Sequence, residues 1–418
     1  MLLQPIENSQ AVYAESETPR YRYLGAEDAT SSARVFRAQH KLGWRCVVPS
    51  KINLFLEVLG RREDGYHDLD TLMHAIDLTD VLEIYPTDSS SITLSVDVSQ
   101  ALAIPGASSI PGLSSSTGLN SSPGLDSQDR AFQIPSDSSN LVVRALEKLR
   151  ARLELPHHRN QGASVVLRKR IPAQAGLGGG SADAVAALLL GSLLWTQSVD
   201  VDLLRPLAAE LGSDLNFFLD GQCLAKRVPS PVAMIGSEKD LLLSWSARCT
   251  GRGELVEPLS SDLSLHGVIV HPREGCNTGE VFKKLRSGGE LDGPRRSPEG
   301  LLKRIGELQA LSGLNGKASH DSQPWNELGH LLYNRLDAAA KQTTAWVQRA
   351  SNRLDRYNPH GQCLTGSGSA RFCLCSSREQ ADEIATEIRK EEEYRAYSVS
   401  SWRTPALSVQ IANCLHSS

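Results

Sequence analysis

A glycine-rich segment carries the clearest chemical signal in this sequence. Residues 171–187 read IPAQAGLGGGSADAVAA, a proline-led loop that runs into good helix formers. Glycine lacks a Cβ, so the loop can present several N–H groups to one anion. Ser181 is placed to cap the following helix, whose positive dipole end faces the same anion. The segment predicts a phosphate-binding loop, with candidate residues Pro172, Ala173, Gly176, Leu177, Gly178, Gly179, Gly180, Ser181 and Ala182.

Other interpretations of the glycines compete with this one. A Walker A loop needs Gly-Lys followed by Ser or Thr, but the single Gly-Lys pair, at 316–317, is followed by alanine. A dinucleotide-binding fingerprint would take Asp200 as its acidic residue, and it fits poorly because Ser181 replaces its third glycine. A flexible glycine linker is disfavoured by the proline before the loop and the apolar helix after it.

Three further segments extend the pattern. Residues 47–84 read VVPSKINLFLEVLGRREDGYHDLDTLMHAIDLTDVLEI, residues 211–218 read LGSDLNFF, and residues 363–375 read CLTGSGSARFCLC. Together with the glycine loop, they resemble the motifs of the GHMP small-molecule kinases. Within that superfamily the chain is similar to the kinases of 4-diphosphocytidyl-2-C-methyl-D-erythritol. It lacks the Ser-Ser pair of mevalonate kinases and the early G-E-H signature of galactokinases.

The resemblance implies an α+β protein with the two-domain GHMP kinase fold and an active site in the interdomain cleft. We expect an N-terminal ATP-binding domain over 46–258 and a C-terminal domain over 259–418. Residues 1–45 are polar and irregular, with no signal-peptide pattern, and are expected to form a disordered extension. Two insertions are predicted, a Ser-, Gly- and Pro-rich one at about 99–134 and a second at about 226–247.

The resemblance also implies a reaction. ATP, with Mg²⁺, would phosphorylate the 2-hydroxyl of 4-diphosphocytidyl-2-C-methyl-D-erythritol in the non-mevalonate route to isoprenoid precursors. Asp214 would then accept the hydroxyl proton, and Lys51 beside it would keep the carboxylate ionised and stabilise the transferred phosphoryl group. No dedicated metal ligand is predicted, but Ser181 could reach either Mg²⁺ or a phosphate oxygen. By sequence alone, Asp214 just inside a helix could serve only the helix dipole, and Lys51 could be an exposed strand lysine.

Four residues are candidates for binding the substrate. Asn53 faces the same side of its strand as Lys51, because side chains alternate, and could hold the substrate hydroxyl. The resemblance implies that Tyr66 stacks on the cytosine, that His67 contacts the edge of the base, and that Phe282 supplies a second ring. The structural alternatives are a solvated turn for Tyr66 and His67 and a helix core position for Phe282.

Regular elements must position these residues. Strands are predicted over 45–58, 81–85, 91–96, 164–170 and 266–272, and helices over 182–190, 201–211, 214–221, 278–286, 325–341 and 344–357. Thr365 to Ser369 form the turn of a hairpin, and the resemblance implies that this turn supports the phosphate loop. It also places Asn334 near the cleft.

Composition limits the class of protein. The formal net charge is −4 and the pI is about 6.3, which argues against a nucleic-acid partner. The longest apolar run, 184–195, is short for a membrane span and predicts a buried helix and no membrane partner. Eight cysteines without a C-x-x-C predict a cytoplasmic protein, with Cys373 and Cys375 in the core. A hydride-transfer enzyme, a catalytically dead nucleotide-binding regulator and another GHMP kinase remain as alternatives.

Overall fold

The computed structural model of the chain describes residues 2–5, 21–24, 42–99, 132–155, 161–223, 245–259, 263–272, 275–289, 293–315, 323–391, 393–402 and 410–413. Most of the predicted extension over 1–45, and most of the two predicted insertions, lie outside these residues. Within the extension, β1 (Leu2–Pro5) pairs antiparallel with β2 (Tyr21–Leu24). The predicted domain boundaries stay a prediction.

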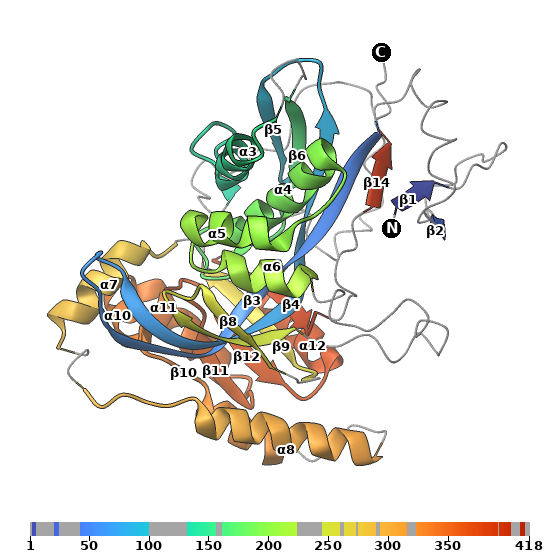
Figure 1. Ribbon diagram of the computed structural model, residues 1–418. Helices are drawn as coiled ribbons and strands as arrows, with labels where there is room; N and C mark the ends of the chain where they lie inside the picture. Colours follow the sequence, from blue (N-terminus) through green and yellow to red (C-terminus); the bar gives the residue numbers. More distant parts are fainter. Residues whose placement is uncertain are drawn as a thin grey trace, which may run out of the picture.

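The largest sheet is built on one long hairpin. β3 (Leu42–Arg61) and β4 (His67–Pro86) pair antiparallel along nearly their whole length (Figure 1). Both strands exceed their predicted bounds, and the predicted strand 81–85 is only the far end of β4. Most of β4 is buried, so the period-2 alternation that marks a strand in a sequence is missing there. A register shift between Asn53 and Phe55 marks a bulge, a feature that re-aims side chains.

The other strands of this sheet flank the hairpin. They are β5 (Ile92–Asp97), β6 (Ala163–Arg168), β7 (Ser246–Gly251), β8 (Leu255–Pro258), β10 (Tyr333–Asn334) and β14 (Gln410–Asn413). The strand order is β10-β3-β4-β6-β5, with β14 also pairing with β3 and with β7 lying between β4 and β8. β10 and β14 come from the last quarter of the sequence, so the end of the chain returns to the first sheet.

A layer of helices, drawn in teal to green in Figure 1, covers one face of this sheet. They are α3 (Leu141–Arg152), α4 (Gly179–Thr196), α5 (Val201–Leu211) and α6 (Leu215–Cys223). Their buried side chains join those of β4 and β6 in one core cluster. The prediction of a helix over 201–211 is confirmed. Asn140 and Asp200 cap α3 and α5 by accepting hydrogen bonds from backbone N–H groups of the first turn.

α4 is the central helix, and it starts earlier than predicted. Gly178, at φ 71°, is its N-cap, and the helix begins at Gly179, so Ser181 lies within the first turn rather than at the cap. The expectation that Ser181 caps the helix was therefore wrong, because the left-handed conformation of Gly178 already ends the loop. α4 has 18 residues and is apolar enough to cross a membrane, but 67% of that window is buried inside the protein. It is a core helix, as predicted.

The second sheet is antiparallel and comes from the C-terminal half. Its strands, in the order β11-β12-β9-β13, are β11 (Gly361–Leu364), β12 (Arg371–Cys375), β9 (His266–Pro272) and β13 (Tyr394–Ser400). The helices of this half are α7 (Thr278–Ser287), α8 (Glu299–Asn315), α9 (Gln323–Leu331), α10 (Asp337–Thr343), α11 (Ala345–Asp355) and α12 (Arg378–Arg389). Cys373 and Cys375 are buried in its core, as expected. The α+β prediction is confirmed.

The predicted helix over 325–341 is broken in the structure. α9 ends at Leu331, the two residues of β10 pair in parallel with Phe55 and Leu56, and α10 begins only at Asp337. The side chain of Asn334 accepts a hydrogen bond from the N–H of Leu336 at 2.9 Å. Pairing with a distant strand and a local side-chain bond thus outweigh the helical propensity of the segment.

The two halves share a hydrophobic core. One cluster contains Phe55 and Leu72 from the long hairpin together with Ile269 and Phe372 from the second sheet. A bridge from Ile76 to Ser401 and an ion pair between Asp77 and Arg378 at 2.8 Å add polar contacts. These contacts hold the long hairpin of the first sheet against the second sheet.

Candidate active site

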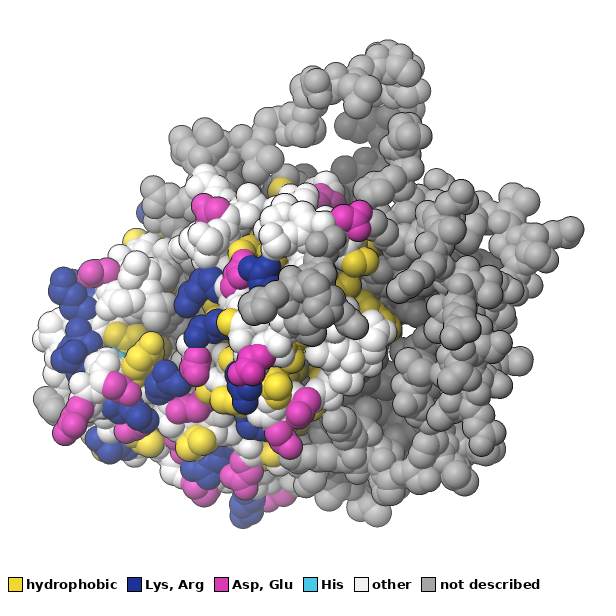
Figure 2. All heavy atoms as spheres, turned by 45° about the horizontal axis from the view of Figure 1, so that its top comes forward, with side chains coloured by type: hydrophobic (Ala, Val, Ile, Leu, Met, Phe, Trp, Pro, Cys, Tyr) yellow, Lys and Arg dark blue, Asp and Glu magenta, His cyan; other side chains and the backbone are white. Residues whose placement is uncertain are grey.

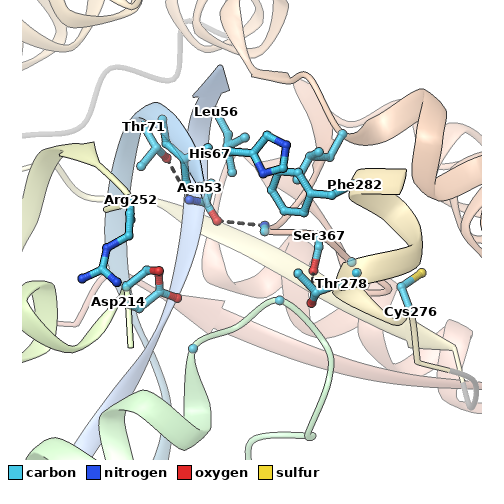
Figure 3. Close-up of a pocket in the computed structure, with 18 of the residues that line it drawn as sticks. Asn53, Leu56, His67, Thr71, Asp214, Arg252, Cys276, Thr278, Phe282 and Ser367 are labelled. Carbon is cyan, nitrogen blue, oxygen red and sulfur yellow. Dashed lines mark hydrogen bonds between the residues drawn. The ribbon is translucent and has the colours of Figure 1, made fainter. Parts of the chain in front are cut away.

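A cleft of about 810 Å³ opens where the two halves meet. Its walls come from the long hairpin, the glycine loop, the start of α6, the β7–β8 turn, α7 and the turn between β11 and β12 (Figure 3). Of the predicted site residues, Lys51, Asn53, Tyr66, His67, Gly176, Gly178, Ser181, Asp214 and Phe282 line it. The loop residues Pro172, Ala173 and Leu177, and Gly179, Gly180 and Ala182 in the first turn of α4, do not line the cleft.

Lys51 and Asp214 form an ion pair at the centre of the cleft. The Nζ atom of Lys51 is 3.4 Å from Oδ2 of Asp214, and the lysine side chain is 3% exposed against 24% for the aspartate. Asp214 directly precedes α6 and its carbonyl oxygen accepts the N–H of Phe218, so it lies just before the helix rather than inside it as predicted. The Lys51 ammonium and the positive end of the α6 dipole both lie next to this side chain. The carboxylate remains reachable from the cleft.

Two glycines of the loop have backbone conformations that other residues rarely adopt. Gly176 has φ 76°, and a Cβ there would overlap the carbonyl oxygen of Thr365. Gly178 has φ 71°, and a Cβ there would lie 2.9 Å from the ring of Phe218. Conformation and close approach therefore both require glycine at these positions. Gly180, in contrast, lies in the helix with open space around it.

A buried charge cluster underlies the loop, and sequence reasoning missed it. Lys169, at the end of β6, donates hydrogen bonds to Asp80 and to Asp183 of α4, the latter at 2.8 Å. Asp80 also accepts the backbone N–H of Ile171 at 2.9 Å. Burial raises the pKa of Asp183 well above its usual range. The cluster ties the strand before the loop to the helix after it.

The turn between β11 and β12 contacts the loop from the second half. The hydroxyl of Thr365 donates a hydrogen bond to the carbonyl oxygen of Gly176 at 3.0 Å. The N–H of Gly366 donates to Oδ1 of Asn53 at 2.8 Å, and the amide of Asn334 donates to the carbonyl oxygen of Gly366 at 2.8 Å. The turn thus lies where it can support the loop, and Asn334 holds the turn rather than facing the cleft.

Asn53 links the two halves of the site. Its Oδ1 also accepts a hydrogen bond from Nζ of Lys51 at 2.8 Å, so the two side chains share one face of β3 as predicted. Its amide nitrogen donates to Oγ1 of Thr71 at 2.8 Å (Figure 3). These bonds orient Lys51 toward Asp214. Asn53 lines the cleft, but most of its hydrogen-bonding capacity is used within the protein.

Aromatic rings from the turn of the long hairpin and from α7 line the cleft. Tyr66 is 53% exposed in the turn of the long hairpin. The ring of His67 stacks on Phe282 of α7 with centroids 4.5 Å apart and an interplanar angle of 24°. Burial lowers the pKa of His67, with further lowering by the charges of Arg286 and Arg61, so the imidazole is neutral at neutral pH. The predicted solvated turn applies to Tyr66 but not to His67.

Arg252 and Thr278 also line the cleft but were not among the predicted site residues. The guanidinium carbon of Arg252 lies 4.8 Å from the centroid of the Tyr66 ring. The hydroxyl of Thr278 is 2.8 Å from that of Ser367. The glycine-flanked arginine of residues 250–254, which read TGRGE, was the available signal for Arg252. Its contact with Tyr66 could not be predicted, because the two residues are far apart in the sequence.

The sequence and the fold were compared with those of known proteins, and the matches are kinases. The family described as the GHMP kinases N terminal domain matches residues 140–222. A protein of Rhodopirellula baltica named 4-diphosphocytidyl-2-C-methyl-D-erythritol kinase is 33% identical, with 82% of this chain and 89% of that protein covered. A protein of the same name from Nocardia farcinica is 31% identical, with 86% and 94% covered.

Solved structures with this fold include kinases of several small molecules. A crystal structure of a 4-(cytidine 5'-diphospho)-2C-methyl-D-erythritol kinase superposes with a TM-score of 0.56 at 25% identity, covering 86% of this chain and 100% of that one. A homoserine kinase from Cytophaga hutchinsonii superposes with a TM-score of 0.51 at 14% identity, covering 90% and 99%. The second match shows the fold alone.

Proposed function

This chain belongs to the 4-diphosphocytidyl-2-C-methyl-D-erythritol kinase family of GHMP kinases, and we propose that it phosphorylates the 2-hydroxyl of that compound with ATP. The observation that carries the proposal is the continuity of one cleft. It is lined by the glycine loop, by the Lys51–Asp214 pair and by Tyr66. A nucleoside triphosphate, the reacting hydroxyl and the cytosine of the substrate can therefore be bound side by side in it. The product belongs to the non-mevalonate route to isoprenoid precursors.

We assign the chemistry to Asp214 and Lys51. Phosphoryl transfer to an alcohol needs positioning, charge neutralisation and a proton acceptor rather than a protein nucleophile. Asp214 accepts the proton of the hydroxyl at its carboxylate, which faces the cleft. Lys51, fixed by Asn53 and by the carbonyl oxygen of Gly176 at 3.0 Å, stabilises the charge that develops on the phosphoryl group. The alternative role of Asp214, serving the helix dipole alone, does not account for this pairing.

The phosphates of ATP are assigned to the glycine loop and the first turn of α4. Loop N–H groups and the positive end of the helix dipole favour an anion there. Mg²⁺ neutralises phosphate charge when bound and keeps several water ligands, so a site with few protein ligands suits it. Within the described residues no cluster of three His, Cys, Asp or Glu is found, and the hydroxyl of Ser181, which lines the cleft, is the ligand we assign.

A turnover assay tests the proposal directly. Purified protein with MgATP and 4-diphosphocytidyl-2-C-methyl-D-erythritol is expected to form ADP and a 2-phosphorylated product, followed by phosphorus NMR. Mevalonate, galactose and homoserine serve as competing alcohols, because kinases of the same fold act on them. A folded protein that phosphorylates one of these but not the cytidine compound would assign it to another GHMP kinase subfamily. Reduction of a nicotinamide cofactor would instead support the hydride-transfer alternative.

Tyr66→Ala is expected to weaken binding of the cytidine substrate. Stacking of a base on an aromatic ring is worth roughly 1 to 3 kcal/mol, so KM for that substrate should rise by about 5- to 150-fold. The KM for ATP and kcat should change little, because Tyr66 lies in the hairpin turn away from the glycine loop. Tyr66→Phe, which keeps the ring, is the matched control and should stay close to the parent protein. An unchanged KM in Tyr66→Ala would remove Tyr66 from the base-binding site.

We also propose a cytoplasmic setting with small-molecule partners only. Six of the eight cysteines, Cys46, Cys249, Cys276, Cys363, Cys373 and Cys375, are buried and form no disulfides with one another, which suits a reducing compartment. On the face drawn in Figure 2, the described basic and acidic side chains are mixed rather than separated by sign. A nucleic-acid site would favour a basic area of one sign.

A further inference from the structure

Four charged side chains line the cleft within the described part of the chain: Lys51, Asp214, Arg252 and Arg286. Lys51 is paired with Asp214, so its charge is largely balanced by that carboxylate. The proposed reaction brings two polyanions into this cleft, ATP and a cytidine diphosphate ester. The glycine loop accounts for the phosphates of the first. The diphosphate of the second requires a cation, and Arg252 and Arg286 are the candidates.

Position separates the two arginines. Arg286 belongs to α7, and its charge lowers the pKa of His67. Arg286 therefore lies near His67. Arg252 lies in the β7–β8 turn, with its guanidinium carbon 4.8 Å from the Tyr66 ring centroid. Figure 3 shows it beside Asp214, across the cleft from His67 and Phe282. Arg252 therefore lies between Tyr66, which we assign to the cytosine, and Asp214, which we assign to the reacting hydroxyl.

The surrounding protein holds Arg252 in this place without using its whole guanidinium group. Nη2 donates a hydrogen bond to the carbonyl oxygen of Ala209 at 3.0 Å, and Nε is 3.5 Å from a carboxylate oxygen of Glu254. The backbone N–H of Arg252 donates to the other oxygen of Glu254 at 2.6 Å, which fixes the turn. A guanidinium has five N–H donors, so these contacts leave donors of Nη1 for a ligand. The side chain is 22% exposed.

We propose that Arg252 binds the diphosphate group of the cytidine substrate and makes the site selective for a nucleoside diphosphate ester over a plain alcohol. The inference rests on the proposed function. In such a substrate the diphosphate connects the ribose of the cytidine to the polyol that carries the reacting hydroxyl. A group held by Tyr66 at one end and Asp214 at the other must place its diphosphate beside Arg252. The planar guanidinium matches phosphate oxygens in a two-point contact, and its prior fixation reduces the entropy lost on binding.

Binding of truncated ligands tests this role. Cytidine and CDP are titrated by calorimetry into the parent protein and into Arg252→Met, which keeps side-chain length and removes the charge. The parent protein is expected to bind CDP more tightly than cytidine. In Arg252→Met, CDP affinity should fall by about 10- to 100-fold, the range for losing a hydrogen bond to a charged group, while cytidine affinity stays within about threefold. Retained cytidine binding also reports that the variant is folded.

Two further variants sharpen the comparison. Arg252→Lys keeps the charge but not the planar fork, and it should lose part of the CDP affinity. Arg349→Met is the matched control, because Arg349 lies 4.9 Å from the ring centroid of Trp346 on α11, outside the cleft, and it should bind both ligands like the parent protein.

Several outcomes would overturn the inference. If Arg252→Met lost cytidine and CDP affinity equally, the arginine would only support Tyr66. If CDP affinity were unchanged while kcat or the KM for ATP changed, Arg252 would act on the nucleotide triphosphate instead. A parent protein that binds neither cytidine nor CDP would contradict the proposed function itself. A parent protein that binds cytidine and CDP equally, yet turns over the full substrate, would contradict the inference alone.

Discussion

Replacing Asp214 with asparagine is expected to lower kcat by about a hundredfold or more, the lower end of the range for losing a general base. The side-chain amide of this variant cannot accept the hydroxyl proton, but an asparagine can still occupy the position before α6 and serve as a helix cap. The glycine loop is untouched, so binding of ATP should be largely kept. Steady-state kinetics measure kcat, calorimetry measures ATP affinity, and thermal unfolding checks that the variant is folded.

Lys51→Met should reduce kcat by a similar factor, because it removes the charge next to Asp214 and the donor to Asn53 and Gly176. The double variant should be little worse than either single variant. Groups that act as one catalytic unit have strongly non-additive effects, whereas independent groups would multiply their losses. The assignment of the base would have to be abandoned if Asp214→Asn kept near-parental turnover, or if the two losses multiplied.

Gly176→Ala is expected to be the most damaging single change in the glycine loop. Alanine disfavours φ 76°, and its Cβ would overlap the carbonyl oxygen of Thr365. The left-handed conformation costs about 1 to 2 kcal/mol and the overlap about 1 to 3 kcal/mol more. The loop or the β11–β12 turn must therefore move, and the hydrogen bond from Thr365 to the carbonyl oxygen of Gly176 is lost with it. We expect ATP affinity, turnover and the free energy of unfolding to fall together.

A second glycine offers a matched control for this prediction. Gly306 lies in α8, outside the cleft, and a Cβ there would meet nothing within 4 Å. Gly306→Ala should raise the free energy of unfolding by up to about 1 kcal/mol, as expected for a helical glycine, and leave turnover unchanged. Chemical denaturation and the kinase assay on both variants compare the two glycines. Equal behaviour of the two variants would mean that the strain and overlap at Gly176 are relieved at no cost.

Sequence patterns identified many of the residues that line the cleft, because the signals they use are local. Glycines within a few residues of a helix start predict an anion-binding loop, and alternation along one strand places Lys51 and Asn53 on the same face. The LGSD motif at 211–214 marked Asp214. The NTGEVF segment at 277–282 marked Phe282, on a helix that the structure confirms as α7. The loop and the strand face were inferred from residues that are neighbours in sequence, where steric and hydrogen-bonding preferences act directly, whereas Asp214 and Phe282 were identified by resemblance to family motifs.

Sequence patterns failed where a residue's environment comes from a distant part of the chain. Most of β4 is buried, so its sequence lacks the alternation by which a strand is recognised. Asn334 interrupts a helical pattern because β10 pairs with β3, a contact that no local propensity encodes. The position of Asp214 differed from expectation by one residue, which is within the usual uncertainty of helix ends.

The residue types that line the candidate site were thus determined by the sequence alone, and their mutual arrangement was decided by the tertiary structure. Thr365 and Gly176 are 189 residues apart in the chain, and Arg252 reaches Tyr66 from a different hairpin. Lys169 joins Asp80 and Asp183 beneath the loop in the same way. Such contacts depend on how sheets and helices pack to bury apolar surface, a property of the whole chain that short-range patterns do not contain.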